Sequence, residues 1–154
     1  LLWITFFLYG LLHPMDGILA FRMEHCVTLE ATSNKPINQF WKDRLTDVLI
    51  GSVKADDGTL LHLSTEEYEH LFDWKRVCKE VTVIQPLFYV RQKDGRLKMQ
   101  AVWAKSCRGA MVRFILNNRP VTHEELSAFS YEGFEFAPQL GDENNPHFVR
   151  ENVK

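Results

Sequence analysis

The chain has 154 residues, of which 45% are hydrophobic and 25% charged, and its formal net charge is −2. Its 11 Phe and 4 Trp side chains argue against an intrinsically disordered chain, because disordered chains contain few aromatic residues and these side chains can bury a large area in a core. The small net charge excludes a global basic field that would hold the whole chain on nucleic acid or on an anionic membrane. Any site for a polyanion must therefore be a local patch.

The first twelve residues, LLWITFFLYGLL, are nearly all apolar. A membrane helix needs about 20 such residues, and here His13, Pro14 and Asp16 end the run. A signal peptide would need a basic segment before the apolar run, and none is present. We therefore expect no membrane partner. Residues 1–12 are instead expected to form a core helix of a domain whose first part is absent from this chain.

A second helix is expected to open at residues 34–37, with Pro36 near its first turn. Apolar residues then recur at helical spacing, which predicts one buried face. Asp56-Asp57-Gly58 is a turn signal, and residues 59–63 are expected to form a short strand. The apolar face of this helix consists of Ile37, Phe40, Trp41, Leu45, Val48 and Leu49.

Two capping-box patterns mark further helix starts. Ser64 stands three residues before Glu67, and Thr122 three residues before Glu125. In this pattern each side chain accepts a hydrogen bond from the other residue's backbone N–H group. The first pattern predicts a helix that runs to about Trp74.

Between the two boxes the sequence predicts a β-hairpin followed by a helix. Residues 80–91 and 96–105 are expected to be strands, joined by a turn at 93–95 that contains Asp-Gly. Pro86 cannot donate to a strand ladder, so it indicates an edge or a bulge. A helix is expected over residues 106–118, and residues 137–146 are expected to be loop. This order of elements predicts a single α+β domain over residues 1–154.

The densest functional candidate lies in residues 105–119, which hold four cations and no acid. Lys105 and Arg108 are expected to share one helix face, while Arg113 is turned well away from Arg108. At a strand-to-helix turn, Lys105, Arg108 and the free N–H groups near Gly109 could bind a phosphate. The alternative is a set of solvated or internally paired cations. The predicted nucleic-acid or anion-binding residues are Lys105, Arg108, Gly109, Arg113 and Arg119.

Arg22 and Glu24 form a second candidate, a possible cleft site. On a strand, residues two apart point to the same side, so these two could form half of a buried polar site. The alternative is an ordinary ion pair. His25 and Cys26 follow directly, but adjacent strand residues point to opposite sides, so we expect no metal site there.

No catalytic residue, metal-ligand set or cofactor motif is recognisable. The chain has no Gly-rich phosphate loop, no H-E-x-x-H and no G-x-S-x-G. Cys26, Cys78 and Cys107 are widely spaced and include no C-x-x-C pair. We expect three reduced thiols in a reducing cytosol.

An ordered set of motifs resembles the YaaA peroxide-stress family. The segment LYGLLHPMD over residues 8–16 is similar to the family's L-Y-G-x-L-x-P-x-D, and residues 104–119 are similar to its A-K-x-x-R-G-x-M-x-R-F-x-x-x-N-R block. Ser106 departs from the family, which has a second basic residue there. Further matches in family order are Arg22 with Glu24, Phe40-Trp41, Glu67-Tyr68 and Gly133-Phe134.

The resemblance implies a cytosolic protein that limits hydrogen peroxide damage by restraining unincorporated iron. It also implies a compact fold with a positively charged cleft, and DNA binding through a helix-hairpin-helix-like element. The family's N-terminal strand and S-P-A-K stretch have no counterpart in these 154 residues, so the resemblance implies that they correspond to roughly the last three fifths of a member.

No catalytic mechanism follows from the resemblance. The acid-free basic block and the family resemblance together give the first hypothesis, a DNA-associated stress-protection protein that contacts phosphates without reading bases. Its phosphate contacts would come from Lys105, Arg108, Arg113 and Arg119. A second hypothesis is an enzyme of unknown reaction that acts on an anionic small molecule through a basic cleft. In that case Arg22, Glu24, Lys105 and Arg108 would converge.

Overall fold

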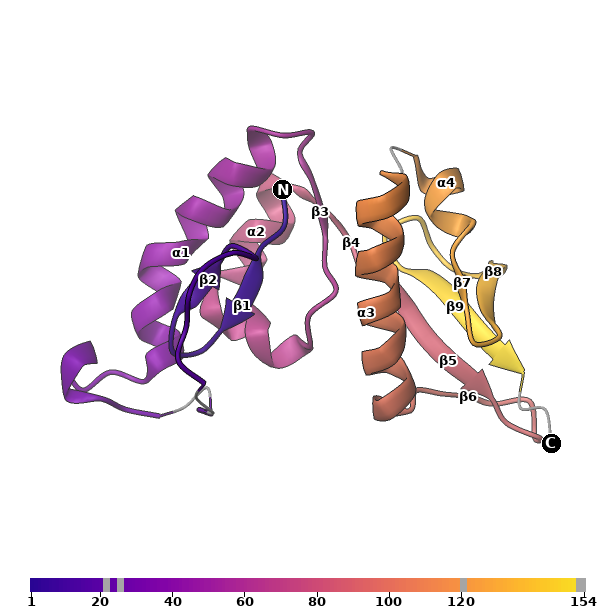
Figure 1. The fold of residues 1–154 in the computed structure, drawn as a ribbon, viewed down its shortest axis with the longest axis horizontal. Coiled ribbons are helices and arrows are strands. Elements are labelled where there is room, and N and C mark those ends of the chain that lie inside the picture. Colours follow the sequence, from indigo (N-terminus) through magenta and orange to yellow (C-terminus); the bar gives the residue numbers. More distant parts are fainter. Residues whose placement is uncertain (21–22, 25–26, 120–121, 152–154) are drawn as a thin grey trace. The chain divides into compact units, whose positions relative to one another are not determined.

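The computed structural model describes residues 1–20, 23–24, 27–119 and 122–151, and its mixture of helices and strands is the predicted α+β class (Figure 1). The chain forms two compact units. Unit 1 comprises Leu1–Leu60 and Ser64–Thr82, and unit 2 comprises Leu61–Leu63 and Val83–Lys154. The single domain over residues 1–154 stays a prediction. Among the described residues, no helix combines the length and the apolar character that a bilayer span requires.

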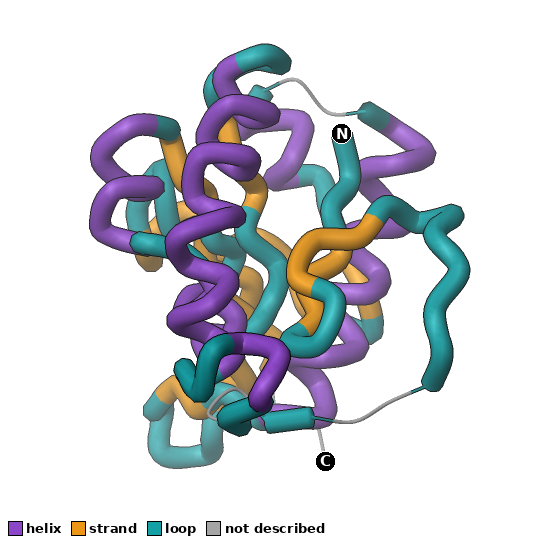
Figure 2. The backbone as a smooth tube through the Cα atoms, turned by 90° about the vertical axis from the view of Figure 1, so that its left-hand side faces the viewer, coloured by secondary structure: helices purple, strands orange, loops and turns teal. Residues whose placement is uncertain are grey.

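Unit 1 is built around one long helix, α1 (Ile37–Lys54), which packs against the 3₁₀ helix η2 and the short helix α2. Figure 2 shows these helices in purple and the strands in orange. The remaining elements of this part of the chain are β1 (Ile4–Phe6), β2 (Gly10–Leu12), η1 (Glu30–Thr32), β3 (Thr59–Leu61), η2 (Glu66–Leu71), α2 (Trp74–Glu80) and the start of β4 (Thr82–Ile84).

The helix expected over residues 1–12 is wrong, because this segment forms an antiparallel hairpin. Strands β1 and β2 pair with Phe6 opposite Gly10. Gly10 has φ +74°, a left-handed conformation that cannot continue an α-helix and that glycine adopts readily. A Cβ atom at this position would lie 2.9 Å from Leu45 Cδ1, so glycine also lets the strand approach α1. The left-handed turn and this close approach favour the hairpin over the helix that the apolar run predicted.

Helix α1 begins where the sequence predicted, with Pro36 as its N-cap residue. Two indole groups hold the hairpin in place: Trp41 Nε1 donates to the Phe7 carbonyl at 2.8 Å, and Trp3 Nε1 donates to Ser52 Oγ at 3.1 Å. The helix face that α1 buries comprises Ile37, Leu45, Thr46, Leu49, Ile50 and Val53.

The helix expected from Ser64 to about Trp74 is replaced by two shorter ones. The N-cap residue of η2 is Thr65, without a side-chain capping bond, and the second helix α2 starts only at Trp74. Asp73 caps α2, since its Oδ1 accepts from the Arg76 N–H at 3.3 Å. An Asp directly before Trp74 is a strong N-cap signal. Residue 80 consequently ends a helix rather than opening a strand.

Unit 2 is a five-stranded sheet covered on one face by helices α3 and α4 (Figure 1). The strand order is β6-β5-β9-β8-β7, with β5 and β9 parallel and the other pairs antiparallel. Its core comprises Phe88, Val90, Cys107, Met111, Leu126, Phe129, Phe134 and Phe148. Its elements are β5 (Leu87–Arg91), β6 (Leu97–Lys98), α3 (Ala101–Asn118), α4 (His123–Ser127), β7 (Ser130–Tyr131), β8 (Phe134–Gly141) and β9 (Pro146–Glu151).

The predicted hairpin around residues 93–95 is confirmed, but its second strand is short. Val90 pairs with Lys98, and Gly95 in the turn has φ +81°. Strand β6 has only two residues, because α3 takes over at Ala101. Pro86 lies between β4 and β5, which belong to different sheets. Its missing N–H therefore falls where one ladder stops and the next begins.

The loop expected over residues 137–146 is largely wrong, because β8 extends to Gly141 and β9 starts at Pro146. The ladder between them is irregular from Phe136 to Gly141, a stretch that contains Pro138. A proline inside a bulge removes a donor without removing the strand. The turn itself is closed by Asp142, whose Oδ1 accepts from the backbone N–H groups of Asn144 and Asn145 at 2.9 and 2.8 Å.

Candidate functional site

Helix α3 positions the predicted basic residues, and it begins five residues earlier than the sequence suggested. Its first residue is Ala101, so Lys105, Arg108 and Gly109 lie in its second and third turns. At an interior helical position the backbone N–H donates to the carbonyl four residues earlier. The N–H of Gly109 is therefore not free, and the predicted phosphate site at a strand-to-helix turn is wrong. Alanine is the best helix former, which fits the earlier start at Ala101.

The helix separates the four cations into different environments. Lys105, Gly109 and Arg113 are exposed and follow one another at intervals of four residues. Each interval turns by about 40°, so the three fall within an arc of about 80°, and about 12 Å of helix rise separates the two cations. We call these three residues the basic stripe.

The basic stripe has no compensating acid within the described ranges. Helix α3 contains no Asp or Glu, and within the described part of the chain no carboxylate lies within 4.0 Å of Lys105 or Arg113. The apolar side chains of Val102 and Leu116, which are 78% and 56% exposed, lie on the same helix. This face of α3 therefore presents two positive charges that have no acidic partner among the described residues.

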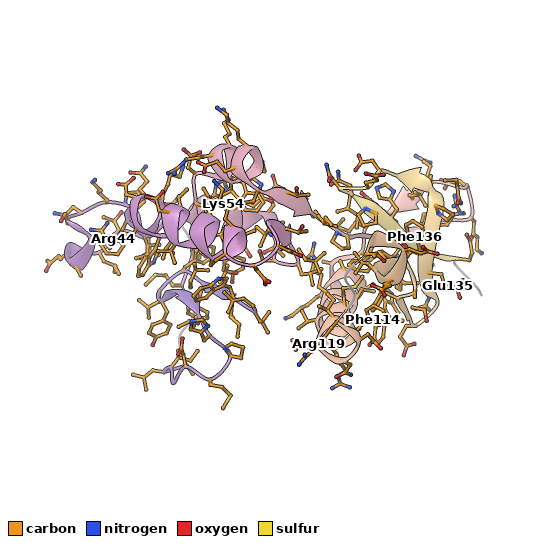
Figure 3. All side chains as sticks on the ribbon, turned by 90° about the horizontal axis from the view of Figure 1, so that it is seen from above. Arg44, Lys54, Phe114, Arg119, Glu135 and Phe136 are labelled. Carbon is orange, nitrogen blue, oxygen red and sulfur yellow. The ribbon has the colours of Figure 1, made fainter. Side chains whose placement is uncertain are left out.

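Arg119 lies apart from the basic stripe, at the C-terminal end of α3 (Figure 3). It is the C-cap residue, has φ 47°, and donates its backbone N–H to the Ile115 carbonyl at 2.8 Å. A left-handed residue at this position ends the helix. Arg119 remains an exposed cation roughly one and a half turns beyond Arg113.

Arg108 faces inward and is half-buried. Burial lowers the pKa of its guanidinium, against a lesser opposing effect from Cys107. The neighbouring His62, which is 7% exposed, has its pKa lowered to about 4 by burial and, second, by the charge of Arg108. The His62 backbone N–H donates to the Ile84 carbonyl at 2.8 Å, which fixes this segment against β4. Sequence reasoning did not find His62, because nothing local distinguishes it from the other five histidines.

Arg150 is a second inward-facing cation that the sequence did not reveal. Its guanidinium carbon lies 4.3 Å from the ring centroid of Trp103, and its Nη1 is buried without a hydrogen-bond partner in the described structure. Cys107 is fully buried, and burial raises the pKa of its thiol to about 11 against the opposing charges of Arg150 and Arg108. Cys107 is therefore a protonated core thiol rather than a nucleophile.

A cavity of about 400 Å³ lies on unit 2. Within it, Arg91 Nε pairs with Glu151 Oε1 at 3.0 Å, and Glu135 lies at the edge of the unit opposite α3 (Figure 3). The cavity therefore carries both signs of charge. Its lining comprises Arg91, Glu132, Gly133, Glu135, Phe136, Ala137, Gln139, Val149, Arg150 and Glu151.

The other predicted candidates are not brought into one site. Glu24 is exposed and belongs to unit 1, whereas the basic stripe belongs to unit 2. Arg22, His25 and Cys26 lie outside the described residues. The predicted convergence of Arg22 and Glu24 with Lys105 and Arg108 stays a prediction. Across the described ranges, no group of three or more His, Cys, Asp or Glu side chains is arranged to hold a metal ion.

Fold and site together define an α+β protein that presents, on one face of a helix, exposed cations without an acidic partner in the part of the chain that the structure describes. The sequence profile of the family described as "Peroxide stress protein YaaA" matches residues 1–140. The chain belongs to this family, which confirms the resemblance found in its motifs.

Relatives from several bacteria share much of this sequence. The chain is 45% identical over 146 residues to a UPF0246 protein of Bacteroides thetaiotaomicron, covering 95% of this chain and 56% of the relative. It is 47% identical over 148 residues to a UPF0246 protein of Porphyromonas gingivalis, covering 96% and 58%. For a UPF0246 protein of Flavobacterium johnsoniae the identity is 37% over 143 residues, covering 93% and 55%. The chain thus spans little more than half the length of these relatives.

Proposed function

We propose that this chain acts in the cytoplasmic peroxide-stress response by restraining unincorporated iron, and that its basic stripe binds nucleic-acid phosphates without reading sequence. Membership of the peroxide-stress family supports the first part. One observation carries the second part. Lys105 and Arg113 are exposed on one face of α3, about 12 Å apart along the helix, and neither has an acidic partner in the described structure.

The chemistry of this face favours phosphate over base contacts. Between the two cations the stripe offers only Gly109, which has no side chain, and the short Ser106 hydroxyl beside it cannot reach a base edge in a groove. Contacts to phosphates position a protein on nucleic acid but carry no direct sequence information. Two such contacts correspond to weak binding, with a dissociation constant in the non-specific range of about 10⁻⁴–10⁻⁶ M.

The binding part is tested by fluorescence anisotropy with two labelled duplexes of unrelated sequence. We expect similar affinity for both duplexes, and weaker binding by Lys105→Ala and by Arg113→Ala. The matched control is Arg96→Ala, since Arg96 belongs to unit 2, has an 85% exposed side chain and pairs with Asp94 at 2.8 Å. Wild-type affinity in both stripe variants would contradict the proposal, as would equal weakening by Arg96→Ala.

The stress-protection part is tested in a bacterium that lacks its own family member. Expression of the chain is expected to raise survival in hydrogen peroxide and to lower the chelatable iron measured by electron paramagnetic resonance. Less unincorporated iron leaves less metal to convert peroxide into hydroxyl radical. Survival that rises while chelatable iron stays unchanged would contradict the proposed role of iron.

A second candidate function is an enzyme that acts on an anionic small molecule, and Arg150 favours it. Arg150 borders the cavity of unit 2, and its Nη1 lacks a partner among the described residues. The half-buried guanidinium stacks on Trp103, and in the described structure no carboxylate lies within 4.0 Å of it, so an anionic ligand in the cavity would supply an opposite charge. Incubation of the purified protein with a bacterial metabolite extract tests this candidate. Depletion of an anionic metabolite would support an enzyme, and an unchanged extract would count against one.

A further inference from the structure

Gly109 occupies a position where neither the backbone nor the packing of the described structure needs glycine. It lies in the interior of α3 without a positive φ, and a Cβ atom there would meet nothing within 4 Å. Glycine in a helix interior is less favourable than alanine, because it loses more backbone freedom on folding. Glycine at this position therefore destabilises α3, and neither the helix backbone nor its packing requires it.

The residues around Gly109 indicate that its exposed backbone contacts a ligand. Lys105 lies one turn before it and Arg113 one turn after it, on the same side of the helix and both exposed. Because Gly109 has no side chain, the surface of the helix is depressed between the two cations. Glycine is used where a ligand must approach a backbone closely, and the flanking charges select an extended polyanion as that ligand.

We propose that Gly109 is the contact point on which a nucleic-acid sugar–phosphate backbone rests, between phosphates held by Lys105 and Arg113. This inference rests on the proposed function of the basic stripe. A methyl group at residue 109 adds an atom about 1.5 Å from the Cα, directly between the two cations. It would lift the bound backbone and lengthen the charge-assisted hydrogen bonds, which are strongest at about 2.7–2.9 Å.

Unit 1 supplies a matched control at Gly51. This glycine is also exposed and helical, and a Cβ atom at its position would likewise meet nothing within 4 Å. The residue one turn before it is Asp47, whose carboxylate pairs with Arg76 at 2.7 Å. The cation three residues after it, Lys54, pairs with Glu80 at 2.6 Å. Gly51 thus shares the helical setting of Gly109, but its charged neighbours are ion-paired and do not form a stripe of cations.

The experiment compares Gly109→Ala, Gly109→Leu and Gly51→Ala in thermal unfolding and in duplex binding. Both alanine variants are expected to raise the unfolding midpoint, by about 2–4 °C. Gly51→Ala should bind the duplex like wild type, Gly109→Ala about fivefold more weakly, and Gly109→Leu more weakly still.

The outcomes separate this inference from the proposed function. If Gly109→Ala and Gly109→Leu bind like wild type while Arg113→Ala binds more weakly, the role of Gly109 is overturned and the basic stripe stands. If neither Lys105→Ala nor Arg113→Ala changes binding, the proposed function fails whatever Gly109 does. A lower unfolding midpoint for Gly109→Ala would show that packing requires the glycine, which also overturns the inference.

Discussion

His62 is expected to make the stability of unit 2 depend on pH. Its side chain is 7% exposed, and its pKa is lowered from 6.5 to about 4, first by burial and second by the charge of Arg108. In the unfolded chain the imidazole returns to its ordinary value near 6.5. Between these two values the unfolded state binds the proton and the folded state does not. Acidification therefore favours unfolding, and stability is lost as pH falls from about 6.5 towards 4.

The size of this effect follows from the shift. Because the pKa is lowered from 6.5 to about 4, the complete loss of stability, reached below pH 4, is about 3 kcal/mol. Between pH 7 and pH 5 only part of it is developed, and the same linkage gives a loss of about 2 kcal/mol. Urea denaturation followed by circular dichroism at these two pH values measures the loss.

Two variants isolate the contribution of His62. His62→Gln cannot titrate, so its free energy of unfolding should fall by about 2 kcal/mol less than that of wild type between pH 7 and pH 5. Arg108→Met removes only the smaller cause of the shift, so its pH dependence should lie between the two. Equal losses in wild type and His62→Gln would refute the reasoning.

Three further predictions concern unit 2 and the free thiols. Thr122→Ala removes the acceptor for the Glu125 N–H at 3.1 Å and should cost about 1 kcal/mol in urea denaturation, so an unchanged midpoint would refute the cap. Met111→Ala opens a cavity under a fully buried side chain and should cost about 2–5 kcal/mol, whereas a loss well below 1 kcal/mol would contradict its place in the core. Cys78 is exposed and Cys107 buried, so mass spectrometry of the native protein treated with iodoacetamide should find label on Cys78 before Cys107. The reverse order would contradict this packing.

Features that depend on local chemistry were predictable from the sequence. Helix α1 begins after Pro36, the hairpin turns at Gly95, and Thr122 caps α4 with the expected partner. In each case a short motif carries the physical cause, either a preset φ, a left-handed turn or a pair of capping bonds. The Glu125 carboxylate, for example, accepts from the Thr122 N–H at 3.1 Å as the capping box requires.

Features that depend on distant partners were not predictable. Strand β9 pairs in parallel with β5, so that His147 stands opposite Leu87. No local turn links two such strands, because a parallel pair needs a long crossover. Phe134, Glu135 and Phe136 alternate in burial as the start of β8, but the strand continues through Pro138 to Gly141 only because β9 lies beside it.

The candidate site was predicted in part. The cluster of cations over residues 105–119 was visible in the sequence, but their exposure depends on where α3 begins and which face it buries. Cys107 and Met111 take the buried face, which turns Arg108 inward and leaves Lys105 and Arg113 exposed. The setting of Arg150 has no signal in the sequence, because its partner Trp103 lies 47 positions earlier on another element.

The salt dependence of duplex binding tests the basic stripe most directly. The logarithm of the binding constant is measured against the logarithm of salt concentration for wild type and for the Lys105→Ala/Arg113→Ala double variant. Each lost phosphate contact should reduce the slope by about 0.9, so the double variant should lose about 1.8. An unchanged slope in the double variant would show that these two cations do not contact phosphate, and would contradict the account.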